Sequence, residues 1–290
     1  MGFDNATFQV LLTAREAGVS FSRVLTIGRQ WLYVTEKEMC EMLARHRIFV
    51  SAKQAKEVLT EQKGYCEPLL KLLGADRIDS IDASSYEGAS ILHDMNQPLP
   101  DAYRNEFSVV IDGGCLEHVF DFPRALKNCM EAVATGGHFI GITPANNLMG
   151  HGFYQFSPEL FFRVFTSANG FRIAKIILYE YPWKRVWYEV ADPAQVRRRV
   201  ELTNRRPAYL IVWAQKTASL PILQQPPQQS DYLAVWQHHA GGASPPPRSL
   251  VYLLKRYAPA WMVRMYRTLR SVYRTLRPFQ PGLYTCKKVN

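Results

Sequence analysis

The stretch FSVVIDGGCLEHVFDFPRAL, residues 107–126, decides how this chain folds. Its first part, 107–112, is apolar and rich in β-branched residues, which is typical of a buried strand in a parallel sheet. Gly113 and Gly114 end that strand, and the helical pattern that follows extends over about 122–134. A strand that leads into a helix is the repeating unit of an α/β fold.

The same alternation continues on both sides of this stretch. Strand patterns occur at 23–28, 77–82, 90–93, 138–142, 171–180 and 207–216, and helical patterns at 35–47, 52–62, 66–73 and 157–169. Strands that alternate with helices predict a Rossmann-like open sheet, mostly parallel, with helices on both faces. The last two strands have no clear helical crossover between them, so we expect them to form an antiparallel edge.

Length and composition agree with a cytoplasmic globular protein. The chain has 290 residues, of which 47% are hydrophobic and 21% charged, enough to bury a core. No apolar run reaches the ~20 residues that span a bilayer, and the start lacks the pattern of a secretory signal. The five cysteines are odd in number and widely spaced, which argues against a disulfide framework or a zinc site and favours a reducing compartment.

Charge and composition divide the chain into three parts. Residues 1–180 contain 17 Lys and Arg against 21 Asp and Glu, whereas residues 181–290 contain 18 against 4. Residues 217–247 hold six prolines and five glutamines, which is typical of a linker. We therefore expect a domain at 1–216, a linker at 217–247, and a basic amphipathic helix with a tail at 248–290.

Glycine and acidic residues follow the predicted strands in order along the chain. Six stretches of sequence carry this pattern. These are VLTIG (24–28), IDSIDAS (78–84), ILHDMNQPLP (91–100), FSVVIDGGCLEHVFDFPRAL (107–126), ATGGHFIGITP (134–144) and YQFSPELFFRVFTSANGF (154–171). In this order and spacing the chain resembles the class I S-adenosylmethionine-dependent methyltransferases over roughly 21–216.

The resemblance implies S-adenosylmethionine as the cofactor and gives roles to particular residues. Gly28 is similar to a glycine of the cofactor loop, Asp82 to the acidic residue that accepts hydrogen bonds from the ribose hydroxyls, and Asp94 to the one that faces the adenine amino group. The full set expected to bind the cofactor is Gly28, Arg29, Asp82, Asp94, Met95, Asp112 and Cys115, with Met95 against the adenine ring and Cys115 beside the sulfonium.

The cofactor loop departs from the family pattern. Gly28 is the one glycine that remains, and Arg29 and Trp31 stand where small residues are expected. We expect Arg29 to contact the cofactor carboxylate; the alternative is a pocket that has lost cofactor binding. The pattern G-x-G-x-x-G is absent after the first strand, which disfavours a nicotinamide-dependent oxidoreductase.

The candidate catalytic residues are His151, Glu117 and His118. His151 lies between two glycines in a loop that should cover the substrate side of the cofactor, and an imidazole titrates near neutral pH. It is therefore a candidate general base for a hydroxyl; the alternative is a residue that caps a turn. No metal-ligand spacing is evident, so we expect no metal.

Aromatic residues suggest the methyl acceptor. Phe153, Tyr154 and Trp183, together with Trp187 and Tyr188, are expected to be exposed and to stack on sugar faces. The predicted function is methyl transfer to a small-molecule or glycan hydroxyl, in glycan biosynthesis. The alternative is a catalytically degenerate methyltransferase fold that serves as a membrane-associated scaffold or interaction module.

The C-terminal segment 248–277 is predicted to be a basic amphipathic helix. Its arginines recur every three or four residues (Arg264, Arg267, Arg270, Arg274, Arg277), opposite an apolar face (Met262, Met265, Tyr266, Leu269, Val272, Tyr273, Leu276). Such a helix is typical of attachment to an anionic membrane surface, here the cytoplasmic face; the alternative is packing on the domain or a partner. Nucleic acid is disfavoured, because the aromatic rings are not interleaved with the arginines.

Overall fold

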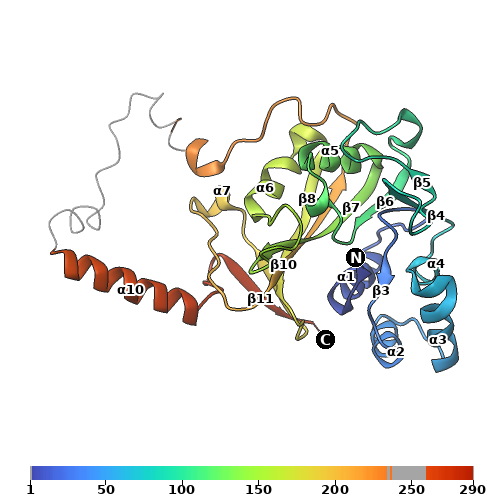
Figure 1. The fold of residues 1–290 in the computed structure, drawn as a ribbon, viewed down its shortest axis with the longest axis horizontal. Helices are drawn as coiled ribbons and strands as arrows, with labels where there is room; N and C mark the ends of the chain where they lie inside the picture. The colour runs from blue at the N-terminus through green and yellow to red at the C-terminus, as the bar shows by residue number, and fades with distance from the viewer. Residues whose placement is uncertain (1, 234–235, 237–258, 290) are drawn as a thin grey trace.

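The computed structural model describes residues 2–233, 236 and 259–289, apart from the side chain of Arg274. Its strands are β1 (Gly2–Phe3), β2 (Arg23–Ile27), β3 (Trp31–Leu32), β4 (Arg77–Asp82), β5 (Ile91–Leu92), β6 (Phe107–Asp112), β7 (Val133–Asn146), β8 (Phe171–Glu180), β9 (Val186–Val190), β10 (Ala208–Lys216) and β11 (Tyr284–Lys288). Its α-helices are α1 (Asn5–Glu16), α2 (Glu36–Arg45), α3 (Ala52–Thr60), α4 (Glu67–Leu72), α5 (Phe122–Ala132), α6 (Pro158–Val164), α7 (Pro193–Val196) and α10 (Ala260–Leu276) (Figure 1).

A nine-stranded sheet forms the centre of the molecule, in the order β11-β9-β8-β10-β7-β6-β2-β4-β5. The five strands from β7 to β5 are parallel to one another. The chain runs from β2 outward to β4 and β5, then returns to β6 and β7 on the other side of β2. The strand order therefore reverses between β2 and β6, and this reversal is where open α/β sheets bind ligands. The predicted Rossmann-like α/β fold is confirmed.

The antiparallel part of the sheet is larger than the sequence predicts. β10 lies between β7 and β8 and is antiparallel to both, so it is an internal strand and not an edge. β9 and β11 extend the sheet beyond β8, again antiparallel, and β11 is the edge. The apolar run of β10 is buried on both faces, which suits an internal position.

Helices cover both faces of the sheet, and the strands pack side chains into two cores. Along β10, Leu210 and Val212 join the core beneath α5 and α6, whereas Ile211 and Trp213 join the core beneath α1–α4. This alternation is the two-residue period of a strand. Figure 1 shows the two helical layers on opposite sides of the sheet.

The predicted helix starts at Thr35 and Ser157 follow capping chemistry. The Thr35 hydroxyl accepts a hydrogen bond from the Glu38 N–H, and the Glu38 carboxylate accepts one from the Thr35 N–H, which is a capping box. The Ser157 hydroxyl accepts a hydrogen bond from the Glu159 N–H at the start of α6.

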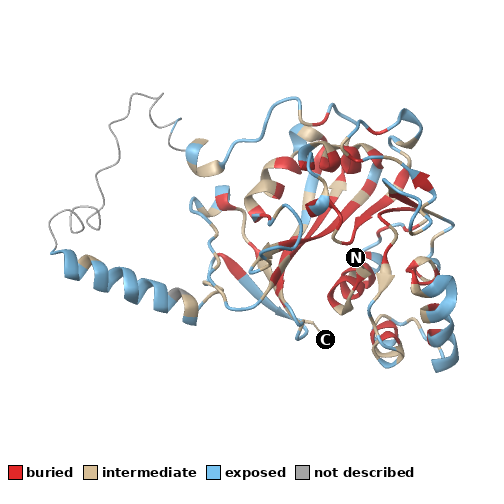
Figure 2. Ribbon diagram, viewed as in Figure 1, coloured by how far each residue is buried: buried red, intermediate tan, exposed pale blue. Residues whose placement is uncertain are grey.

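The C-terminal third does not divide as expected. Ile222, within the expected linker, is buried in the core, and β11 adds the expected tail to the sheet. The expected helix at 248–277 is represented by α10, while 248–258 lie outside the described residues. α10 projects from the sheet domain, and most of its described side chains are exposed (Figure 2). No helix in the described ranges is long and apolar enough to cross a membrane.

Candidate functional site

Three of the predicted cofactor residues lie along one edge of the sheet. The Gly28 N–H donates a hydrogen bond to the Ile81 carbonyl at 2.8 Å, which places Gly28 beside Asp82 at the end of β4. On the other side of β2, Ile27 is paired in register with Asp112 at the end of β6. Gly28 therefore lies between the two carboxylates, at the reversal in strand order.

Asp112 is fully buried. Its Oδ1 accepts a hydrogen bond from the Cys115 N–H at 2.8 Å, and its Oδ2 has no partner. Burial raises the pKa of this carboxyl. The Cys115 thiol donates to the Ile27 carbonyl at 2.7 Å, and burial raises its pKa as well, so it remains a neutral thiol that joins β6 to β2.

Asp82 and Asp94 both close turns. The Asp82 carboxylate accepts a hydrogen bond from the Ser84 N–H at 3.0 Å and retains acceptor capacity at the strand end. The exposed Asp94 carboxylate accepts bonds from the backbone and side-chain amides of Asn96, and these lower its pKa. Met95 is buried in the hydrophobic core, so the structure does not present it to an adenine ring as predicted.

Arg29 has a structural role in place of the predicted contact with the cofactor. Its guanidinium donates to the Glu67 carboxylate, to the Glu87 carbonyl at 3.1 Å and to the Gln62 side chain at 3.1 Å. It also lies over the Tyr65 ring, 4.0 Å from the centroid. These contacts connect the loop after β2 to the segments around α3 and α4.

Gln30 occupies the space that the missing glycines would leave open, and the sequence prediction did not include it. Its side chain is fully buried, and its amide donates to the Ile27 carbonyl at 2.5 Å. A Cβ atom at Gly113 would lie 2.3 Å from the Gln30 Oε1, so the side chain presses on the end of β6. Gln30 Oε1 has no hydrogen-bond partner, which leaves an acceptor at this position.

A pocket of about 480 Å³ opens beside Gly113, between the carboxyl ends of β6 and β7 and the start of α1. Such a volume is in the range of small-molecule sites. It is lined by Gly2, Asp4, Thr7, Tyr33, Gly113, Gly114, Glu117, Ile142, His151, Tyr179, Tyr181 and Tyr209. Glu117 and His151 were predicted for this site, whereas Asp4 and the four tyrosines were not.

Asp4 and the tyrosines make one wall of this pocket polar. The Asp4 carboxylate caps α1 by accepting from the Thr7 N–H at 2.9 Å, and it also accepts from the Tyr179 hydroxyl at 3.3 Å. The Tyr179 and Tyr209 rings are stacked, with centroids 5.6 Å apart. Burial raises the pKa of both phenols, which therefore act as neutral hydrogen-bonding groups.

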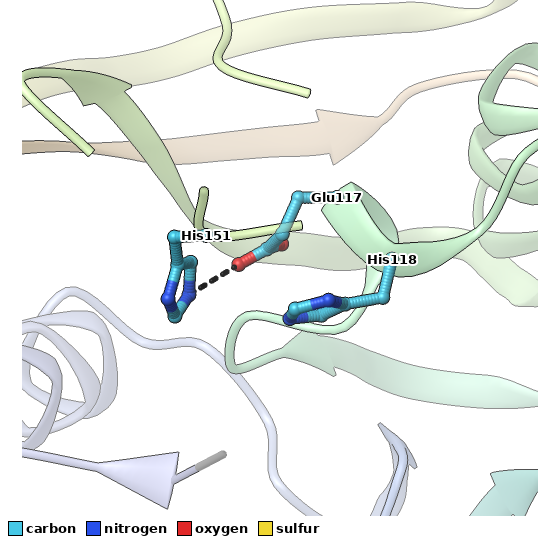
Figure 3. A group of neighbouring side chains, drawn as sticks. All are labelled: Glu117, His118 and His151. Carbon is cyan, nitrogen blue, oxygen red and sulfur yellow. Dashed lines mark ion pairs between the residues drawn. The ribbon is translucent and has the colours of Figure 1, made fainter. Parts of the chain in front are cut away.

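The three predicted catalytic residues form one cluster (Figure 3). The Glu117 carboxyl is 1% exposed, has no hydrogen-bond partner, and points at the His151 ring, with Oε1 3.5 Å from Nε2. Burial and, secondarily, the negative charge of Asp112 raise the pKa of Glu117. A carboxyl in this state can gain or lose a proton near neutral pH.

The second histidine lies beside the first. The rings of His118 and His151 meet edge to face, with centroids 5.4 Å apart. Burial and, secondarily, a positive charge on His151 lower the pKa of His118. The ligand atoms of Glu117, His118 and His151 all lie within 4.8 Å of one another, so this set could also hold a metal ion, which the sequence spacing did not indicate.

Gly152 positions the loop that carries His151. Its φ is +77°, and a Cβ atom there would lie 2.8 Å from the Glu117 carbonyl oxygen and 3.1 Å from the His118 Nδ1. The next residue, Phe153, donates its N–H to that same carbonyl at 2.8 Å. The loop therefore packs closely against the turn that contains Glu117 and His118.

The aromatic residues expected to bind a sugar are not equally exposed. Phe153 is 66% exposed and meets the exposed Phe120 edge to face, with centroids 6.0 Å apart. Tyr154 is half-buried and donates to the Phe120 carbonyl, and Trp183 is half-buried and donates to the Val186 carbonyl. The expected exposure is confirmed for Phe153 alone. It was wrong for Tyr154, Trp183 and Tyr188, which are half-buried, with Tyr188 stacked on Phe279, and for Trp187, which is buried.

Comparison with known proteins finds no matching family model and no matching curated protein. Solved structures with a similar arrangement include an S-adenosylmethionine-dependent methyltransferase from Mesorhizobium loti (15% identity over 73% of this chain and 97% of that chain, TM-score 0.36). Another is the [4+2]-cyclase SpnF (13% identity, 76% and 84%, TM-score 0.41).

A further similar structure is the branched-chain polyamine synthase from Thermus thermophilus, solved with N4-aminopropylspermidine and 5'-methylthioadenosine. The identity is 14% over 78% of this chain, the TM-score is 0.36, and this chain spans 60% of the synthase. At these identities and TM-scores, none of the three assigns an activity to this chain.

Proposed function

We propose that this protein transfers a methyl group from S-adenosylmethionine to a hydroxyl group of a small molecule or glycan. The observation that carries the proposal is the Glu117 carboxyl, which is buried without a hydrogen-bond partner, faces His151, and lines a pocket beside Gly113 and Gly114. A buried group of this kind with a raised pKa is typical of catalytic sites. The order of strand-end residues that resembles the methyltransferase family supports the choice of reaction.

The sheet edge supplies the groups that would hold the cofactor. The Asp82 carboxylate is the acceptor for the ribose hydroxyls, and Gly28 allows close approach of the backbone at the end of β2. Two acceptors without partners, Asp112 Oδ2 and Gln30 Oε1, are buried at this edge, and movement of the Gln30 side chain would expose them to cationic or N–H donors of the methionine part. When bound, the cofactor supplies a methyl group on a positively charged sulfur.

The Glu117–His151 pair handles the proton. With the Nε2–H directed at the Glu117 carboxyl, Nδ1 of His151 is left as the basic nitrogen, and it accepts the proton of the acceptor hydroxyl. S-adenosylmethionine, held by Gly28 and Asp82, would supply the methyl group to the hydroxyl oxygen, and the electron pair of the carbon–sulfur bond would remain on sulfur. Glu117 stabilises the protonated imidazole, and its raised pKa lets it share that proton.

We further propose that the hydroxyl that accepts the methyl group belongs to a glycan. The exposed rings of Phe120 and Phe153 lie edge to face, and Phe153 is two residues from His151. Either exposed ring face could stack on the apolar face of a sugar ring, while the tyrosine hydroxyls and Asp4 suit its hydroxyl groups.

A second candidate function is favoured by Gln30. Its side chain fills part of the crevice between β2 and β6 and is held there by the Ile27 carbonyl. If the cofactor cannot displace it, the fold is catalytically degenerate and serves as a scaffold or interaction module.

Titration calorimetry of the full chain with S-adenosylmethionine and with S-adenosylhomocysteine separates the two candidates. Methyl transfer requires saturable heat with both ligands. Absence of heat at millimolar ligand, with the protein folded by circular dichroism, would overturn the proposal and leave the scaffold. A parallel titration and activity assay with a chelator tests whether Glu117, His118 and His151 hold a metal ion. Loss of activity on chelation would assign the role of the base to a bound ion in place of His151.

A further inference from the structure

The helix α10 presents an unusually apolar surface to solvent. Its side chains Trp261, Met262, Met265, Leu269, Val272, Tyr273 and Leu276 are between 42% and 72% exposed. Elsewhere in the described residues most large apolar side chains pack into two cores, and those that are exposed come mostly from separate loops and strand ends. Contiguous exposed apolar surface of this kind marks a site of interaction.

The apolar residues share one side of the helix. At 3.6 residues per turn, these seven side chains fall within an arc of about 120°, and Arg264, Arg267, Arg270 and Arg277 fall on the opposite arc. Leu269 and Leu276 lie near the middle of the apolar arc, Trp261 lies at one edge and Tyr273 at the other. An aliphatic centre with aromatic residues at the edges matches a membrane interface, where Trp and Tyr rings lie at the headgroup level.

The charged residues in the sequence around α10 are all positive. Residues 232–290 contain ten Lys and Arg and no Asp or Glu. A helix that lies on anionic lipid is typically rich in Lys and Arg on its polar face, with Trp and aliphatic residues on the other face, which is the composition seen here. Charge and aromatic placement therefore favour a lipid surface over a second copy of the chain or the sheet domain itself.

The segment after α10 connects the helix to the sheet domain. Phe279 stacks on Tyr188 with centroids 3.5 Å apart, Leu283 is buried, and β11 pairs with β9. The C-terminal end of the helix is thereby attached directly to the sheet, while the apolar arc remains exposed. Binding of α10 to a surface would hold the whole domain there.

We propose that α10 lies in the headgroup region of a membrane that contains anionic lipid, with its apolar arc buried and its arginines on the lipid phosphates. The proposal is independent of methyl transfer. The apolar arc gives affinity for the interface, and each arginine adds about a fivefold gain near an anionic surface.

Co-sedimentation of the full chain with phosphatidylcholine vesicles, with and without phosphatidylserine, tests the proposal. We expect binding to the anionic vesicles, weak binding to neutral ones, and loss of binding as the screening length falls from ~10 Å at 0.1 M to ~3 Å at 1 M salt. Replacing three arginines by glutamine, Arg264→Gln with Arg267→Gln and Arg270→Gln, should weaken binding about a hundredfold. The same positions changed to lysine keep the charge and should retain most of it.

A matched pair of double variants tests the apolar arc. Leu269→Gln with Leu276→Gln should weaken binding at least tenfold, whereas Leu269→Met with Leu276→Met should not change it. Equal sedimentation of the glutamine and methionine variants would overturn the proposal, as would equal binding to neutral and anionic vesicles. A dimer in analytical ultracentrifugation that the glutamine pair abolishes would assign the arc to a second copy instead.

Discussion

At the scale of single residues, Asp82 is the sharpest test of cofactor binding. Its carboxylate stands beside Gly28 at the end of β4, where it can accept from two adjacent hydroxyls. Asp82→Ala should weaken S-adenosylmethionine binding by on the order of 1.5–3 kcal/mol, the range for hydrogen bonds to a charged group. Calorimetry measures the change, and Asp101→Ala, at an exposed carboxylate, serves as the control. Equal affinities in the two variants would remove Asp82 from the site.

His151 tests the chemistry separately from binding. His151→Ala removes the proposed base but leaves the sheet edge intact, so turnover should fall ~10²-fold while cofactor affinity is retained. Turnover is followed by formation of S-adenosylhomocysteine once an acceptor is found, and His93→Ala is the control for loss of an imidazole elsewhere. Unchanged turnover would return His151 to a role in the turn, where its N–H donates to the Leu148 carbonyl.

Some site residues were predictable from sequence and others were not. The predicted strands end at Asp82 and Asp112 or directly before Gly28. Because parallel strands bring their carboxyl ends to one edge of the sheet, the strand pattern alone is enough to group these three residues. Gln30 was not singled out, although its neighbours Arg29 and Trp31 stand where small residues are expected; only the fold shows that Gln30 fills the crevice. The four tyrosines of the pocket come from three separate segments, the loop after β3, the end of β8 and β10, and no local pattern relates these segments.

At the scale of elements, the loop 150–153 tests how closely His151 is held. Gly152→Ala adds a Cβ atom 2.8 Å from the Glu117 carbonyl, whereas Gly150→Ala, at φ +85°, meets nothing within 4 Å. Both variants carry the strain of a positive φ, about 1 kcal/mol, but the first must also move the loop. We expect a larger loss of activity and of free energy of unfolding for Gly152→Ala, measured by urea titration. Equal losses of activity and of free energy of unfolding in the two variants would show that the loop is not tightly packed against Glu117.

The pairing of β7 with β10 makes stability depend on pH. The Trp213 ring N–H donates to His138 Nδ1 at 3.0 Å, and burial lowers the pKa of His138 to about 4, below the usual value near 6.5. The unfolded chain therefore binds the proton first, and this contribution to stability is lost as pH falls from about 6.5 towards 4, by at most about 1.4 kcal/mol per pH unit. His138→Gln should flatten the dependence of the free energy of unfolding on pH in that window. An identical slope in both proteins would contradict this.

Helices and strands were predicted correctly where the local sequence pattern is enough to identify them. The strands β2 and β6 are largely apolar runs ended by Gly or Asp, β4 alternates Ile with polar residues before Asp82, and α2 has its capping box at Thr35. α1 was missed because it is buried on nearly all sides and lacks a polar face, and β11 because only Tyr284 of its five residues is buried. The place of β10 inside the sheet depends on pairing with β7 and β8, which sequence spacing does not encode.

At the scale of the whole molecule, the C-terminal residues belong to the sheet domain even though their charge differs from the rest. Tyr284 lies opposite Val190 in the β11–β9 pair, and Phe279 covers Tyr188. The basic C-terminal segment is thus joined to the acidic domain at the β9–β11 end of the sheet, and α10 lies outside it. The expected boundary at 216 follows a change in composition and does not match the boundary of the core.

This arrangement predicts that the end of the chain unfolds together with the domain. Leu283 is 2% exposed within the core shared with α5 and α6, so Leu283→Ala should lower the free energy of unfolding by about 2–5 kcal/mol. Lys287→Ala, on the exposed part of β11, is the control and should change little. Urea unfolding followed by circular dichroism should show one transition, shifted to lower urea only in the leucine variant. If the leucine variant left the main transition in place, 1–216 would be an independent domain, because a core that ends at Lys216 does not depend on Leu283.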